Sequence, residues 1–127
     1  MIYLSELDKG IKSMSELNSI EDLEKRIVAI KKEISSLGEM RTGSLSEQYN
    51  VCGKAGCKCK DPKDPQMHGP YYQLSYSRYR KSTSQFVRQE DLEAVRQQLV
   101  DYKTFMKLKD EWIDHSILLA KLRKASR

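Results

Sequence analysis

The sequence predicts a small α+β protein: an N-terminal helix, a zinc-stapled three-stranded antiparallel sheet and a long C-terminal helix, with coiled-coil-like helix pairing. Three observations lead to this prediction. Apolar residues recur at helical spacing on both sides of the chain's middle. Between them lies a segment rich in Tyr, Ser and Thr, which favours strands. All three cysteines and all three prolines fall within residues 52–72.

Six apolar residues with the spacing 3-4-3-4-3 predict the first helix. Ser19 and Asp22 resemble a capping box at its start, and Gly38 is a plausible end. The six residues are Ile20, Leu23, Ile27, Ile30, Ile34 and Leu37. A shorter run with similar spacing, interrupted by Gly10, comes before: Leu4, Leu7, Ile11 and Met14.

The middle segment predicts three short strands. Residues 43–49 form the first, and residues 71–89 read as strand, turn and strand, with the turn near residues 79–82. We therefore expect a three-stranded antiparallel sheet.

The last helix covers a stretch without Gly or Pro that carries two apolar seams in succession. The seams are Leu92, Val95, Leu99 and Tyr102, then, after a phase slip, Phe105, Leu108, Trp112, His115, Leu119 and Leu122. This stripe is too long for one small surface. We therefore expect it to pack on the first helix, on a second copy in a homodimer, or on both.

Composition and charge narrow the possible classes of protein. The chain of 127 residues is 39% hydrophobic and 32% charged, so its core is small. No apolar run approaches the roughly 20 residues that span a bilayer, and the N-terminus does not resemble a secretion signal. We therefore expect a cytoplasmic protein with reduced thiols and no membrane association.

We divide the chain into an N-terminal helical segment (1–40), a zinc-binding β module (41–90) and a C-terminal helix (91–127). The β module carries nine Lys or Arg and four Asp or Glu, a net charge of +5, which equals that of the whole chain. The charges of the two flanking segments cancel. A basic centre predicts an anionic partner.

Cys52, Cys57, Cys59 and His68 have the spacing C-x4-C-x-C-x8-H, which suits a tetrahedral Zn²⁺ site. Four protein ligands leave no open coordination position, so the zinc would be structural. Three unrelated reduced thiols are the simplest alternative, and an iron–sulfur site lacks its fourth cysteine. His115 is the substitute fourth ligand, although its place on an apolar stripe favours a packing role.

Tyrosines and basic residues alternate in the predicted hairpin and indicate nucleic-acid binding, with duplex DNA favoured over RNA. The candidate contacts are Tyr76, Arg78, Arg80, Lys81 and Arg88, with Lys54 and Lys58 near the cysteines. Such a protein would serve as a regulator or a mobile-element accessory protein. A simpler interpretation of these residues is that the tyrosines fill the core of the sheet and the lysines keep the loop soluble. The alternative function is that of a homo-oligomeric assembly or adaptor protein, in which the zinc module contacts a protein partner.

No motif for catalysis is present: the sequence has no Gly-rich phosphate loop, HExxH, GxSxG or paired-carboxylate pattern. We therefore expect neither an enzyme nor a small-molecule substrate.

The run from Gly43 to Tyr76, followed by the helix start after Phe86, resembles a family of small uncharacterised prokaryotic proteins. Their pattern, GSLxxxYxxCGKxxCxC followed by HGPYYxLS, covers about residues 43–110 here. The resemblance implies a zinc module and leaves the activity open. The order of basic, aromatic strands and then a helix is also similar to the arm-type DNA-binding domains of integrases, which lay a three-stranded sheet into the major groove.

Overall fold

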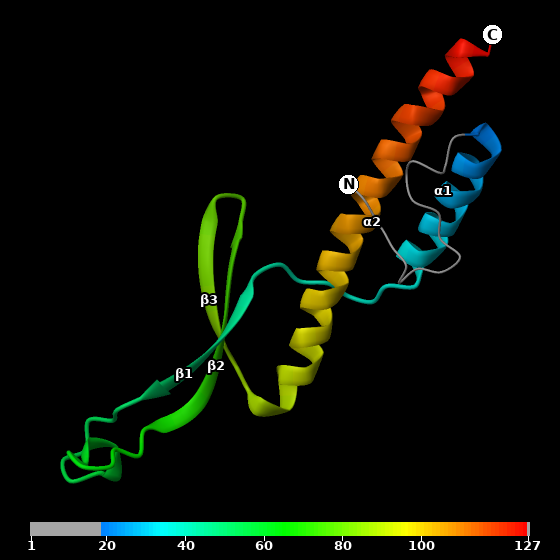
Figure 1. Ribbon diagram of the computed structural model, residues 1–127. Helices are drawn as coiled ribbons and strands as arrows, with labels where there is room; N and C mark the ends of the chain where they lie inside the picture. The colour runs from blue at the N-terminus through cyan, green and yellow to red at the C-terminus, as the bar shows by residue number, and fades with distance from the viewer. Residues whose placement is uncertain (1–18, 127) are drawn as a thin grey trace. The chain divides into compact units, whose positions relative to one another are not determined.

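A computed structural model describes residues 19–126 and confirms the predicted fold class. Figure 1 shows the elements in chain order. They are α1 (Ile20–Ser35), β1 (Ser44–Asn50), the 3₁₀ turn η2 (Lys58–Lys60), β2 (His68–Arg78), β3 (Lys81–Val87), the 3₁₀ turn η3 (Gln89–Asp91) and α2 (Leu92–Ala125). The apolar run predicted before Ser19 lies outside the described residues.

The chain divides into two compact units, and α2 contributes to both. The described residues up to Leu37 belong to one unit together with those from Thr104 onward, and Gly38–Lys103 form the other. Within the described residues, no helix is long and apolar enough to cross a membrane.

The start of α1 follows the predicted capping pattern, whereas its end differs. The Ser19 hydroxyl accepts a hydrogen bond from the backbone N–H of Asp22 at 3.0 Å. The helix is capped at Ser36, before the glycine that was expected to end it. Gly38 instead donates its backbone N–H to the Asp101 carboxylate at 3.0 Å, so this glycine anchors the chain after the helix.

In the first unit, α1 packs antiparallel on the C-terminal part of α2 (Figure 1). Leu23 and Leu119 are buried at the centre of this contact. Ile20, Ile27, Leu118 and Leu122 surround them. The predicted pairing of the two helices is thus formed within one chain.

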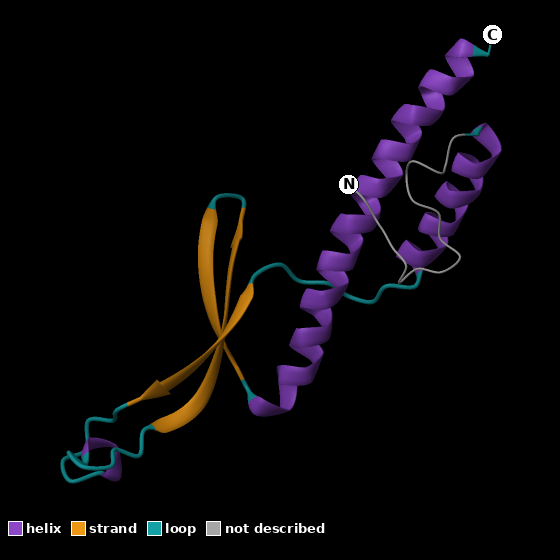
Figure 2. Cartoon of the chain, viewed as in Figure 1, coloured by secondary structure: helices purple, strands orange, loops and turns teal. Residues whose placement is uncertain are grey.

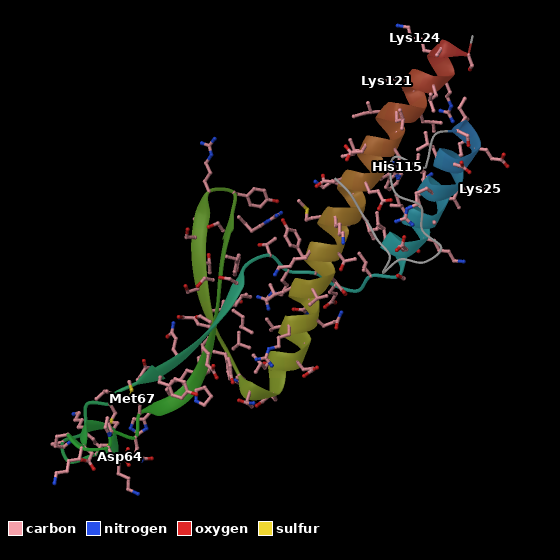
Figure 3. All side chains as sticks on the ribbon, in the orientation of Figure 1. Lys25, Asp64, Met67, His115, Lys121 and Lys124 are labelled. Carbon is pink, nitrogen blue, oxygen red and sulfur yellow. The ribbon has the colours of Figure 1, made fainter. Side chains whose placement is uncertain are left out.

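A buried charged network joins the same two helices. Arg26 donates two hydrogen bonds to the Glu111 carboxylate, at 2.6 and 2.9 Å, and these bonds raise the pKa of Arg26. His115, whose Nε2 lies 3.2 Å from the same carboxylate, is 1% exposed. Figure 3 labels His115 on the side of α2 next to α1. This packing role is the one that the apolar stripe favoured for the histidine.

In the second unit, the strands form an antiparallel sheet in the order β1-β2-β3, and the N-terminal part of α2 covers one face. The core consists of Leu74 and Val87 from the strands and Leu92 and Val95 from α2. Leu45, Tyr72, Tyr76 and Leu99 pack against it. Because side chains alternate along a strand, every second strand residue lies on the other face. Most of these residues are exposed, since no element among residues 19–126 covers them.

The phase slip in α2 has a structural cause. The first seam packs on the sheet, and the second packs on α1. The slip between Tyr102 and Phe105 falls where the two units divide, after Lys103. The helix therefore changes its packing partner at the position where its apolar period is interrupted.

The turn between β2 and β3 consists of Tyr79 and Arg80, with φ angles of 51° and 66°. Arg78 and Lys81 are the cross-strand pair that closes it. Positive φ at both central residues is the geometry that matches the twist of a hairpin, and Asn-Gly is its preferred sequence. Two residues with a Cβ are strained there, and Tyr79 is 90% exposed, so burial does not compensate.

Replacing Glu111 with Ala should destabilise the helix pair. The largely buried Arg26–Glu111 pair would be lost, and Arg26 would keep only its contact to the half-exposed Glu33 carboxylate at 3.2 Å. We expect a cost of about 2–3 kcal/mol in the free energy of unfolding measured with urea. The control is Glu24→Ala, which breaks the exposed pair to Arg123 across the same helices and should cost less than about 1 kcal/mol. Equal losses from the two variants would contradict the assigned role of the buried network.

Replacing Tyr79 with Asn and Arg80 with Gly should stabilise the hairpin by about 1–2 kcal/mol, because the strain of two positive φ angles is relieved. Thermal unfolding measures the gain. The matched control places Asn and Gly at Ser77 and Ser82, the next cross-strand pair, where neither φ is positive. That control should lose stability, and a gain there would point to a cause other than the turn geometry.

Candidate functional site

The connection between β1 and β2, residues 51–67, forms a loop at one end of the sheet (Figure 2). We call residues 51–68 the knot, since they include all four predicted metal ligands. Asp64 and Met67, labelled in Figure 3, lie in this loop. The ladder of β1 and β2 ends at the pair Asn50 and His68, so the histidine is positioned by the sheet itself.

The four ligand atoms of Cys52, Cys57, Cys59 and His68 lie within 4.8 Å of one another. The sulfur atoms of Cys52 and Cys59 are 3.6 Å apart, and the Cys57 sulfur is 3.2 Å from His68 Nε2. In a tetrahedron with metal–sulfur bonds of about 2.3 Å and metal–nitrogen bonds of about 2.0 Å, these edges are roughly 3.8 and 3.5 Å. The donor set and spacing therefore fit a tetrahedral metal site.

The local backbone brings the sulfur atoms together. Cys59 is buried in η2, and the backbone N–H of Cys52 donates to its sulfur at 3.3 Å. The return toward the strand is tied down by the Gln66 N–H, which donates to the Lys58 carbonyl at 2.9 Å, and by the Lys63 N–H, which donates to the Asp61 carboxylate at 2.9 Å. The sequence Asp-Pro-Lys-Asp-Pro at residues 61–65 is thus part of a hydrogen-bonded turn.

Two positions, one in the knot and one directly after it, require glycine. Gly56 has a φ of +80° and Gly69 a φ of +138°. A Cβ on Gly69 would also lie 2.8 Å from the Gln48 carbonyl oxygen. The glycine next to His68 therefore lets β2 approach β1 closely where the metal ligand enters the strand.

The thiols have different acidities. The backbone N–H of Cys59, followed by hydrogen bonds from Cys52 and His68, lowers the pKa of Cys57 to about 6. Burial raises the pKa of Cys59. The lowered pKa favours the thiolate form of Cys57, which is the form that binds a metal. A bound cation would in turn favour loss of the proton from Cys59, because ligation requires a thiolate.

His115, the substitute fourth ligand, is not part of the cluster. It lies in the helix pair of the first unit against Glu111. Among the described residues, the candidate ligand cluster consists of the three cysteines and His68.

The open face of the sheet carries hydroxyl and amide side chains and no charged strand residue. We call this the open face: it consists of the strand residues whose side chains lie on the same side of the sheet as Ser75, as the strand pairing shows. They are Ser44, Ser46, Gln48, Tyr71, Gln73, Ser75, Ser77, Ser82, Ser84 and Phe86. Sequence reasoning missed this face, because it weighed aromatic and basic residues and gave no weight to the alternating Ser and Gln.

Five of the seven predicted nucleic-acid contacts lie in two groups. Arg78, Arg80 and Lys81 are exposed at the end of the β2–β3 hairpin. Lys54 and Lys58 are exposed on the knot, at the opposite end of β2 (Figure 1). The two lysines therefore form a second basic group, separate from the hairpin end.

Two further candidates have their own surroundings. Arg88 is exposed after β3 and lies 3.9 Å from the Glu90 carboxylate. Tyr76 packs against the core on the face covered by α2, the alternative role considered for the hairpin tyrosines. Tyr72 also packs inward, whereas Tyr71 lies on the open face, as expected for neighbours on a strand.

Comparison with known proteins gives a family. A protein-family profile described as a domain of unknown function (DUF6788) matches residues 20–97. The chain belongs to the DUF6788 family. No curated protein and no solved structure matches it significantly. The DUF6788 match includes α1, the sheet and all four clustered ligands, and it ends early in α2.

Replacing His68 with Ala in the DUF6788 chain should weaken metal binding more than about a hundredfold, since even outer-shell partners of a ligand are worth about 10–100-fold. Competition for Zn²⁺ with a coloured chelator measures the affinity. The control, His115→Ala, should leave the metal affinity unchanged even though it loosens the helix pair. A loss of affinity in the control alone would overturn the ligand assignment.

Proposed function

We propose that this DUF6788 protein is a zinc-stabilised nucleic-acid-binding protein that docks the open face of its sheet on duplex DNA. The observation that carries the proposal is the arrangement of one sheet: its open face offers uncharged hydrogen-bonding side chains, and exposed Lys and Arg lie at both ends of its central strand.

Zinc is the metal that suits the knot, because three thiolates and one imidazole are its preferred structural ligands. The ion would supply no reaction chemistry there, since four protein ligands leave no coordination position for a substrate. Cys52, Cys57, Cys59 and His68 would hold it, and His68 would transmit the restraint to β2.

The open face is suited to base edges. Serine hydroxyls donate and accept hydrogen bonds, and glutamine amides offer both a donor and an acceptor. A ribbon of strands fits the major groove of B-DNA, where every base pair presents a distinct pattern of donors and acceptors. The deep and narrow major groove of A-form RNA does not admit such a ribbon, which favours DNA as the partner.

The two basic ends are suited to phosphates. Ten residue steps of about 3.3 Å separate His68 from Arg78, which places the ends of β2 about 33 Å apart. At one end Arg80 in the turn would contact the backbone, together with the long side chains of Arg78 and Lys81, which start from the other face of the sheet at the hairpin end. Lys54 and Lys58 would contact it at the other end. The Arg78 guanidinium lies 5.0 Å from the ring of the exposed Tyr79, so the hairpin end presents cations together with a stacking surface.

A second candidate, assembly through the helices, is favoured by apolar residues left exposed in the first unit. Ile113 and Ile117 are one helical turn apart on α2, and they are 49% and 52% exposed. A homodimer formed through this stripe is compatible with DNA binding, because a two-fold dimer presents two sheets. Without DNA binding, the same stripe would support an adaptor that recruits a protein partner through the knot.

Zinc-loaded protein should bind duplex DNA more tightly than single-stranded DNA or RNA, with an affinity that falls steeply as salt rises. Titration of labelled probes across a salt series measures this. Each phosphate contact contributes about 0.9 to the slope of log affinity against log salt, so Arg78→Ala with Arg80→Ala should reduce the slope by about 1.8.

The control is Lys25→Ala, which removes a charge on the exposed face of α1 and should leave the slope unchanged. Failure to bind any of the three probes at low salt would overturn the proposed function. If the Lys25 variant lost as much slope per removed charge as the Arg78 and Arg80 variant, the change would reflect net charge and not contacts of the hairpin end with phosphates.

A further inference from the structure

The open face has a hollow of about 450 Å³ at the end nearest the knot. Its walls include Gln48 from β1, Tyr71 and Gln73 from β2 and Phe86 from β3. The four are linked by register, since Gln48 lies opposite Tyr71 and Gln73 lies opposite Phe86. We call these four residues the quartet.

The two glutamines of the quartet are paired in a way that leaves one donor group and one acceptor unused. Gln48 Nε2 donates to Gln73 Oε1 at 3.0 Å. Within the part of the chain that the structure describes, no hydrogen bond engages Gln48 Oε1 or Gln73 Nε2. The pair thus offers the carbonyl oxygen of Gln48 and the amino group of Gln73. The hydrogen bond between the two amides fixes the orientation of both groups.

This set complements the major-groove edge of adenine, which presents the N7 acceptor beside the N6 amino donor. The amino group of Gln73 would donate to N7, and the carbonyl oxygen of Gln48 would accept from N6. The same set mismatches guanine, whose edge presents two acceptors.

The two aromatic residues supply the second half of the match. The rings of Tyr71 and Phe86 have centroids 6.4 Å apart at an interplanar angle of 50°. They are 38% and 65% exposed, so the quartet carries apolar surface toward solvent directly beside the amides. An aromatic ring at a base edge contacts the 5-methyl group of thymine, which is the partner of adenine.

We propose that the quartet reads an A·T base pair in the major groove, with Gln48 and Gln73 on adenine and Tyr71 and Phe86 on the thymine methyl group. This inference rests on the proposed function and adds the base preference and the residues that set it. The basic ends of the sheet set the affinity for any duplex, and the quartet sets which duplex is preferred.

The test begins with wild-type protein and needs no variant. Duplexes selected from a random-sequence pool should share an A·T pair. Replacing its thymine with deoxyuridine removes only the methyl group and should weaken binding about fourfold. Replacing its adenine with 7-deazaadenine removes only the N7 acceptor and should weaken binding roughly tenfold.

Two variants then assign the effects to the quartet. Phe86→Ala should bring the ratio of affinities for thymine and uracil close to one, and Gln73→Ala should do the same for adenine and 7-deazaadenine. Neither should change the salt slope, because neither contacts phosphate. Ser84→Ala, on the open face outside the hollow, is the matched control and should keep both ratios.

The outcomes separate the two proposals. Duplex binding with a steep salt slope but with base ratios of one in the wild type overturns the quartet's role and leaves the proposed function standing. If the variants keep the wild-type preference for thymine over uracil and for adenine over 7-deazaadenine, the role of the quartet is also overturned. Other residues would then contact the base pair. No binding to any duplex overturns both proposals.

Discussion

The meeting of four ligand atoms at the end of the β1–β2 ladder is the constraint on which the second unit depends. Of residues 51–67, Cys59 alone is buried, so a loop of this length and polarity has no apolar contacts that would order it. Ligand convergence replaces a core here. His68 is also the first residue of β2 and pairs with Asn50. A restraint on His68 in the loop therefore also restrains the end of the β1–β2 ladder.

The small core of four buried residues explains why one face of the sheet is covered and the other is polar. Leu74, Val87, Leu92 and Val95 occupy the space between one face and the start of α2, and none of the residues that the structure describes forms a second layer on the other face. That face must therefore tolerate water, and its serines and glutamines do so. The small core also leaves two aromatic rings and a pair of amides exposed beside the knot.

Much of the fold was readable because it rests on local patterns. Helical spacing located α1 and α2, the Ser19 cap was correct, and clustered Cys and His marked the knot. The hairpin turn was placed by its position between two strand-forming runs, although Tyr79 and Arg80 are poor residues for positive φ. The buried Arg26–Glu111 pair was not foreseen, because a charged residue in a helix reads as exposed until its partner on the other helix is known.

By itself the sequence determined the elements, their order, the cluster of three cysteines and one histidine, and the surplus of positive charge, since each depends on residues near one another in the chain. Only the tertiary structure decided which face of the sheet α2 covers, and therefore that Tyr76 packs inward while Gln48 and Gln73 meet on the open face. It also placed the two basic groups at opposite ends of β2. The physical reason is register: strand pairing joins residues distant in the chain, and no local preference specifies which of them become neighbours.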